Sequence, residues 1–330
     1  MRFEHFVKLT NSKLLNKPWI DSYNNIQKDV SKIKQGDLFL CYDTSQIDQA
    51  IANGAYAIVT EVDTKIIDEE IAWIKTDSLD LVFSKLLRYS LLEKKIQLFY
   101  ANEVEFALLK HIVLKKEKIF LDHERDKNYK LIINSKLDSI FISSDKEFLN
   151  TIYPNFLTLS FDKFSIQCVK KSLFLSSFIY NELYFENIKL PSIFLHDMQR
   201  VLNFLDINAI EYDIRRCNFI DHFKPVFIDK CMNIQKFGTT SSVLIFEQNI
   251  DLLKKELIYL EQNAPWAKTV AFLPISLKDQ FSTKIKIIYY TNNQEIFDLK
   301  SHKFNFALVF SKNNILHHIL SKPKNSSLLD

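Results

Sequence analysis

The sequence predicts an α/β fold, because apolar runs of strand length alternate with amphipathic helical patterns along most of the chain. Apolar residues make up 47% of the 330 residues and charged residues 25%, which is typical of a chain that buries large cores. Glycine is the exception, with only three copies, at Gly36, Gly54 and Gly238. Since phosphate-binding loops depend on glycine, the positions of these three glycines limit where such a loop could form.

The first 95 residues show the alternation most clearly. A strand is expected at 37–40, after a turn at Gly36, and a second strand at 55–60. Between them, 45–53 has the spacing of a helix, and Gly54 stands where a left-handed residue ends one. A further helix is expected from Leu79, because its apolar residues recur at helical spacing.

The remainder continues the pattern less regularly. The expected helices lie at 104–114, at 194–205 and within 242–262, starting from about residue 246. The expected strands lie at 96–100, 131–134, 139–143, 226–229, 269–273, 285–290 and 306–310. Residues 157–185 are apolar and aromatic without a clear period. Strands that alternate with helices indicate parallel sheets.

Charge and cysteine content exclude several classes of protein. The formal net charge is only +3 and the 43 Lys and Arg residues are dispersed, so we expect no nucleic-acid partner and no membrane surface. The four cysteines are far apart in sequence, which favours reduced thiols over disulfides or zinc. No leader-like segment and no apolar run long enough for a membrane span is seen, so we expect a cytoplasmic protein.

Two segments near the N-terminus carry a resemblance to a known family. Residues 29–39 read Asp-Val-Ser-Lys-Ile-Lys-Gln-Gly-Asp-Leu-Phe, and residues 54–59 read Gly-Ala-Tyr-Ala-Ile-Val. They resemble the opening of the Mur ligases, most of all the MurF branch, where an Asp-Ser-Arg turn precedes Gly-Asp-Leu-Phe and a Gly-Ala-x-x-x-Val strand. Gly36 and Gly54 fall on the two structural glycines of that pattern.

A third segment extends the resemblance. Residues 226–233 read Val-Phe-Ile-Asp-Lys-Cys-Met-Asn, similar to the family's Ile-Asp-Asp-x-Tyr-Asn. Asp229 and Asn233 match, whereas Lys230 and Met232 depart. The resemblance implies a three-unit α/β architecture: a Mur ligase N-terminal-like domain at 1–95, a shortened and degenerate central region at 96–190, and a Rossmann-like C-terminal domain at 191–330. It also implies ATP-dependent amide ligation in peptidoglycan precursor synthesis.

The family's ATP loop, Thr-Gly-x-x-Gly-Lys-Thr between a strand and a helix, is replaced here. Tyr100 and Glu103 stand in place of the glycines, with Asn102 between them, Val104 in place of the Lys and Glu105 in place of the Thr. Each carboxylate near a phosphate costs about 4 kcal/mol at 4 Å and an effective dielectric of 20. We therefore expect no ATP or Mg²⁺ cofactor and no catalytic residues.

Other ligand contacts are expected at scattered polar positions. The family's Ser-Arg pair is Val30-Ser31 here, so the phosphate clamp is lost and Ser31 and Lys32 are the remaining candidates. Asp229, Asn233 and Thr239 are further candidates, Thr239 because residues 238–242 resemble a small anion nest before a helix. The pair His317-His318 lacks accompanying carboxylates, so no metal site is expected.

These observations favour a non-catalytic protein with a binding or scaffolding role in peptidoglycan precursor synthesis. Its partner would be a cell-wall synthesis protein or a UDP-sugar-peptide ligand. One alternative is an active but diverged ATP-dependent amide ligase that uses Lys110, Lys115 or Lys116 for phosphate. Another is a small-ligand binder that uses the N-terminal domain alone.

Overall fold

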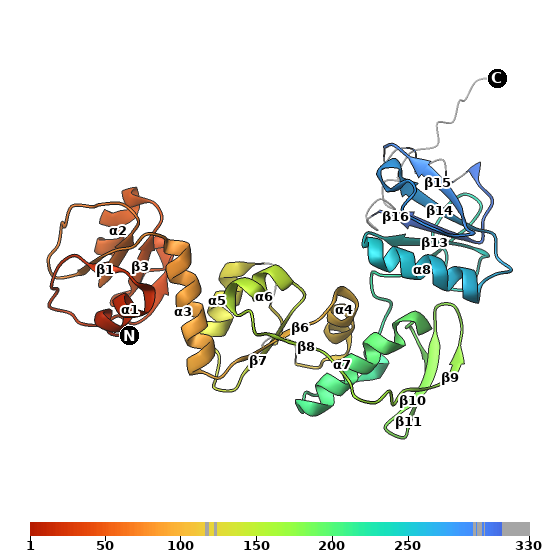
Figure 1. The fold of residues 1–330 in the computed structure, drawn as a ribbon, viewed down its shortest axis with the longest axis horizontal. Helices are drawn as coiled ribbons and strands as arrows, with labels where there is room; N and C mark the ends of the chain where they lie inside the picture. Colours follow the sequence, from red (N-terminus) through yellow and green to blue (C-terminus); the bar gives the residue numbers. More distant parts are fainter. Residues whose placement is uncertain (116–118, 122–123, 293–294, 296–298, 300, 312–330) are drawn as a thin grey trace. The chain divides into compact units, whose positions relative to one another are not determined.

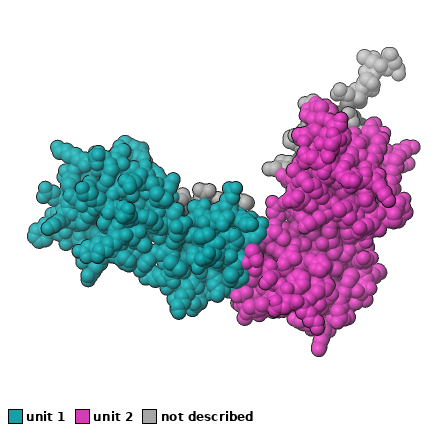
Figure 2. All heavy atoms as spheres, in the orientation of Figure 1, with its two compact units in different colours: residues 1–100, 118–157 teal, residues 101–117, 158–330 magenta. Residues whose placement is uncertain are grey.

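The computed structural model describes residues 1–330 except 116–118, 122–123, 293–294, 296–298, 300 and 312–330. The contacts within the chain divide it into two compact units, coloured separately in Figure 2. Unit 1 comprises residues 1–100 and 118–157, and unit 2 comprises residues 101–117 and 158–330. The three-unit division expected from the resemblance remains a prediction. The pair His317-His318 lies outside the described residues.

Unit 1 begins with a five-stranded sheet in the order β1-β5-β4-β3-β2 (Figure 1). Strands β2 to β5 run parallel and β1 is an antiparallel edge. Its strands are β1 (Lys13–Leu14), β2 (Ile26–Gln27), β3 (Leu38–Cys41), β4 (Ala57–Thr60) and β5 (Ala72–Lys75). The helices of this part are α1 (Phe3–Thr10), α2 (Ile47–Ala52) and α3 (Leu79–Glu93), with single 3₁₀ turns at Val30–Lys32 and Thr44–Gln46. The expected elements of this region are therefore confirmed.

The two N-terminal glycines have the conformations that the sequence predicts. Gly36 has φ +93° in the turn before β3, and Gly54 has φ +91° just after the Asn53 cap of α2. The Gly36 N–H donates to the Gly54 carbonyl oxygen at 3.0 Å, so the turn and the helix end are tied together. Side chains other than glycine are strained at such φ values.

A second sheet has the order β7-β6-β8 and lies in unit 1 except for Thr158. Its strands are β6 (Gln97–Tyr100), β7 (Ile140–Ser143) and β8 (Leu157–Thr158). Helices α5 (Arg125–Ile133) and α6 (Lys146–Ile152) accompany it. The strand expected at 131–134 is wrong, because these residues end α5 and cap it. A short apolar run does not distinguish a strand from a buried helix segment. Here Tyr129 and Ile132, three residues apart, are buried on one face of a helix. One core joins both sheets through α3.

Unit 2 contains an antiparallel sheet in the order β11-β10-β9, and helices α4 (Glu103–Ile112) and α7 (Leu195–Ile207), which contact each other. The strands of this sheet are β9 (Gln167–Lys171), β10 (Ser176–Tyr180) and β11 (Leu183–Ile188). Single 3₁₀ turns lie at Ser192–Phe194, Ile214–Arg216 and Ile275–Leu277. The apolar stretch that resisted assignment thus forms most of this sheet.

The rest of unit 2 is a Rossmann-like layer, with the sheet order β12-β13-β16-β14-β15 and α8 (Ile250–Asn263) along one face (Figure 1). All neighbours are parallel except β12 and β13. The strands are β12 (Lys224–Ile228), β13 (Ser242–Glu247), β14 (Thr269–Pro274), β15 (Lys286–Tyr290) and β16 (Phe306–Phe310).

The helical pattern expected within 242–262 is correct only for its second half, because 242–247 form strand β13. This strand is buried on both faces and therefore reads as a continuous apolar run without alternation. The nest-like residues 238–242 accordingly precede a strand, and the expectation that they precede a helix is wrong. Gly238 has φ +77° in this loop.

Candidate functional site

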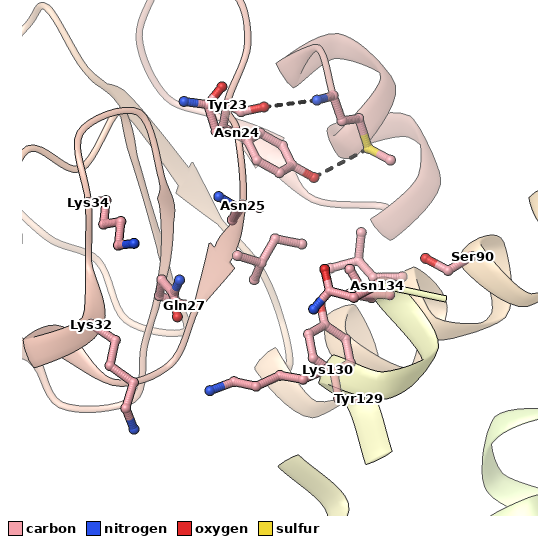
Figure 3. Close-up of a pocket in the computed structure, with 14 residues that line it drawn as sticks. Tyr23, Asn24, Asn25, Gln27, Lys32, Lys34, Ser90, Tyr129, Lys130 and Asn134 are labelled. Carbon is pink, nitrogen blue, oxygen red and sulfur yellow. Dashed lines mark hydrogen bonds between the residues drawn. The ribbon is translucent and has the colours of Figure 1, made fainter. Parts of the chain in front are cut away.

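A cavity of about 490 Å³ in unit 1 lies between the β2–β3 edge of the first sheet and helices α3 and α5. Its apolar wall is formed by Ile26, Leu86, Tyr129 and Ile133. Its polar lining residues carry amides and amino groups: Asn24, Asn25, Gln27, Lys32, Lys34, Lys130 and Asn134. Figure 3 shows Lys130 extending from α5 toward the side of the cavity that carries Lys32. A cavity with these walls suits a ligand that has an anionic part and an apolar or ring part.

One buried carboxylate, that of Asp37, holds the polar residues at the rim of this cavity in place. Asp37 is 1% exposed and begins the segment that enters β3. It accepts hydrogen bonds from the Asn25 backbone N–H at 3.2 Å and the Asn25 side-chain amide at 3.1 Å. It also accepts from the Gln27 amide at 3.3 Å and the Lys34 backbone N–H at 3.0 Å. The Asp of the Gly-Asp-Leu-Phe motif thus orients three cavity residues.

The charge of the cavity is positive. Lys32 forms an ion pair with Asp29 at 2.6 Å, and this hydrogen-bonded pair, with Ser31, lowers the pKa of Asp29 to about 2. Among the described residues, Lys34 and Lys130 form no ion pair, and no carboxylate lines the cavity. Within the part of the chain that the structure describes, these two ammonium groups have no carboxylate partner, which favours binding of an anion.

The structure separates the two candidates Ser31 and Lys32. Lys32 lines the cavity, whereas the Ser31 hydroxyl donates to Asp29 at 2.6 Å and does not line it. Sequence reasoning missed Lys34, Lys130 and Tyr129. The Tyr129 hydroxyl is buried without a hydrogen-bond partner in the described structure, and burial raises its pKa. Only the packing of α5 near the sheet identifies Tyr129 and Lys130, whereas Lys34 lies in the segment 29–39 that resembles the Mur ligases and could have been considered there.

The residues that replace the ATP loop lie at the end of β6 and the start of α4. Tyr100 ends β6 half-buried, and Val104 is buried in the first turn of α4. Asn102 caps the helix: its side-chain oxygen accepts from the Glu105 N–H at 2.9 Å, and Glu105 accepts from the Asn102 N–H at 2.8 Å. This capping box occupies N–H groups that an anion would otherwise use.

A buried ion pair completes the start of α4. The Glu105 side chain is 5% exposed and accepts a charged hydrogen bond from the Arg200 guanidinium, which also binds Asp197. Burial raises the pKa of Glu105, although Arg200 opposes that shift. Asn102 adds a hydrogen bond to Asp197 at 3.1 Å. Within unit 2, the two carboxylates therefore interact both with the positive end of the helix dipole and with the Arg200 guanidinium.

Glu103 belongs to a second acidic cluster, beside a cavity of about 560 Å³. His222 Nδ1 lies 2.9 Å from Glu247, its Nε2 lies 3.7 Å from Glu103, and the Asn249 amide donates to Glu103 at 3.1 Å. Burial lowers the pKa of His222, but the Glu247 and Glu103 carboxylates outweigh it and the net shift is upward. Glu256 is fully buried, and burial beside Glu247 holds its pKa well above the usual range.

This cluster was missed because Glu247 was expected in a helix. As the last residue of parallel strand β13, it stands at the carboxyl edge of the sheet, where such folds place ligand-facing residues. In the described part of the chain, no group of three or more His, Cys, Asp or Glu could hold a metal ion. The cluster therefore offers negative charge but no assembled metal site.

The remaining candidates, Asp229, Asn233 and Thr239, stabilise their own loops. Asp229 accepts from the N–H groups of Cys231 at 2.8 Å and Asn233 at 2.9 Å, and from the side-chain amides of Asn233 and Gln235 at 3.0 Å. Thr239 donates to the Lys236 carbonyl at 2.7 Å. Asp229 and Asn233, which match the Mur ligase motif, therefore stabilise the turn at the end of β12.

Comparison with known proteins first gives the class of fold. No protein-family model matches the sequence, and a search of the curated proteins also finds no match. Solved structures do match over nearly the whole chain, and they are Mur ligases. The chain therefore has a Mur ligase-like, multidomain α/β fold. Within the described residues, no helix is both long and apolar enough to cross a membrane.

Two of the matching structures are MurF ligases. MurF from Thermotoga maritima, in complex with ADP, matches with TM-score 0.51 and 12% identity, covering 90% of this chain and 96% of that one. MurF from Acinetobacter baumannii matches with TM-score 0.51 and 10% identity, covering 95% and 96%. At this identity the likeness establishes the fold alone.

Proposed function

We propose that this protein is a non-catalytic Mur ligase-like protein that binds a UDP-sugar-peptide ligand in the unit 1 cavity and acts in peptidoglycan precursor synthesis. The observation that carries the proposal is the start of α4, where Asn102, Glu105 and Arg200 already satisfy one another. A helix N-terminus binds phosphate through free N–H groups and its positive dipole end. Here a capping box, the buried Glu105 carboxylate and its Arg200 partner occupy the start of the helix.

The alternative of a diverged active ligase finds less support in the same unit. Lys110 lies seven residues beyond the start of α4, roughly 10 Å along the helix, and its amino group sits over the Phe106 ring at 4.4 Å. Lys115 pairs with Glu211 at 2.9 Å. Lys116 lies outside the described residues. Neither described lysine is placed to neutralise phosphate at the helix start.

The unit 1 cavity supports the ligand class. A further Acinetobacter baumannii structure is named a UDP-N-acetylmuramoylalanyl-D-glutamyl-2,6-diaminopimelate–D-alanyl-D-alanyl ligase, and it matches with TM-score 0.50, 10% identity and 95% coverage of both chains. A diphosphate would meet Lys34 and Lys130, with amides at Asn25 and Gln27 for sugar or base.

The proposal is tested by titrating the full chain with UDP-N-acetylmuramoyl tripeptide in a calorimeter. Replacing both uncompensated cations, K34Q/K130Q, should weaken binding at least about tenfold, or 1.4 kcal/mol. The matched control K65Q/K136Q removes two exposed lysines of unit 1 that do not line the cavity. Equal affinities of the two double variants, or no binding by the unchanged chain, would refute this ligand site.

A further inference from the structure

A second hollow, in unit 2, collects cationic side chains that the proposed function does not use. It measures about 640 Å³ and lies between the end of β11 and the 3₁₀ turn Ile214–Arg216. Lys189, Arg215 and Arg216 line it, and the only carboxylate in its lining is Glu186. The hollow therefore carries a formal charge of about +2 in a chain whose total is +3.

Two of the three cations of this hollow contact aromatic rings, and one of these two also has a carboxylate partner. The Arg215 guanidinium lies over the Phe185 ring at 5.3 Å, and the Arg215 backbone N–H donates to the Asp213 cap at 3.0 Å. The Lys189 amino group lies 5.9 Å from the Phe219 ring centre. Within the described structure, Lys189 and Arg216 form no ion pair, whereas Arg215 forms a long one with Asp213 at 4.0 Å. Aromatic contacts orient cations and leave their N–H donors available.

The floor of the hollow is uncharged and buried. It is formed by Phe185, Ile188 and Cys217. Burial raises the pKa of the Cys217 thiol to about 12, so no thiolate competes with an anion at neutral pH. The strand ends irregularly here: Asn187 has φ +50° and its N–H donates to Ser177 at 2.9 Å. The Asn187 N–H is therefore already satisfied by a partner on β10.

We propose that this hollow is a second anion site, which binds the phosphate group of a small phosphorylated molecule or of a lipid headgroup. Two guanidinium groups and one ammonium supply several N–H donors, and guanidinium binds phosphate oxygens in pairs. The site is separate from the unit 1 cavity, so it stands whether or not a UDP-sugar-peptide binds there.

Inorganic pyrophosphate is the probe, titrated into the full chain carrying K34Q/K130Q so that the unit 1 cavity does not contribute. The further change R215Q/R216Q should weaken binding at least about tenfold. R215K/R216K keeps the charge but loses the paired donors, and should give an intermediate loss. The matched control K254Q/K255Q removes two exposed cations on α8 and should stay within about twofold.

A second arm distinguishes the source of the phosphate. Vesicles containing phosphatidylglycerol are sedimented with the same variants. Loss of vesicle binding in R215Q/R216Q, without pyrophosphate binding by the parent, assigns the site to a lipid headgroup. Pyrophosphate binding alone assigns it to a soluble phosphate. If neither probe binds, or if K254Q/K255Q lowers binding as much as R215Q/R216Q, the proposal is overturned.

Discussion

The unit 1 cavity and the start of α4 in unit 2 are both polar, but they differ in whether their charged groups have ion-pair partners. In the cavity, Lys34 and Lys130 are cations without a described ion pair, and the buried carboxylate Asp37 is saturated by N–H donors from the rim. At α4, the Glu105 carboxylate is paired with Arg200 and closes the helix N-terminus. The difference shows that a cation alone does not indicate an anion site. A cation that is already paired with a carboxylate of the protein has little charge left to attract a ligand.

The largest expected effect comes from removing the cation at α4. The change R200M leaves Glu105 buried and unpaired, so the free energy of unfolding should fall by about 3 kcal/mol at pH 7, measured by urea titration of the full chain. The double variant E105Q/R200M should recover much of the loss. A loss well below 1 kcal/mol for R200M would mean that this helix start is not closed by the pair.

A smaller effect is expected at the glycines. In G54A, the new methyl group would lie 3.0 Å from the Gln35 backbone Cα at φ +91°, so we expect a loss of about 2 kcal/mol. In G238A, φ is +77° but no atom lies within 4 Å, so we expect about 1 kcal/mol from backbone strain alone. Thermal unfolding of both variants compares a packed position, where Gly54 ends α2, with the open loop at Gly238. Equal losses of stability in the two variants would contradict the account.

A still smaller effect, with a pH dependence, is expected at Glu256. Its pKa in the folded state lies above its unfolded value, so the folded state holds the proton longer, and stability falls as pH rises from the unfolded value through the folded one. The change E256Q removes that loss and should raise the free energy of unfolding by about 1 kcal/mol at pH 8 and leave it unchanged at pH 4. The exposed control E182Q should show no such difference between the two pH values. An effect of E256Q on the free energy of unfolding that is the same at pH 4 and at pH 8 would count against a protonated Glu256.

Much of this fold could be predicted where the signal is local. The cap at Gly54 and the apolar spacing of α3 depend on neighbours within a few residues, and both are confirmed. Strand β13 could not be predicted in this way, because a strand buried on both faces lacks alternation. The same error concealed Glu247, whose importance depends on its place at the sheet edge.

The candidate site was predictable only in part. Lys32 follows from the turn that resembles the Mur ligases, and it lines the cavity. Lys34 and Lys130 are ninety-six residues apart, and only tertiary packing brings them to one cavity. The pairing of Glu105 with Arg200 is likewise invisible in sequence, because it joins residues from α4 and α7. Charge in a sequence therefore indicates chemistry only after its partners are known.

The most direct measurement titrates the unchanged chain with UDP-N-acetylmuramoyl tripeptide and with Mg-ATP, side by side in a calorimeter. The account predicts saturable binding of the UDP ligand and at least about a hundredfold weaker binding of Mg-ATP, a difference of 2.7 kcal/mol or more. Binding of Mg-ATP as tight as that of the UDP ligand, or tighter, would contradict the central claim that the start of α4 is closed to phosphate.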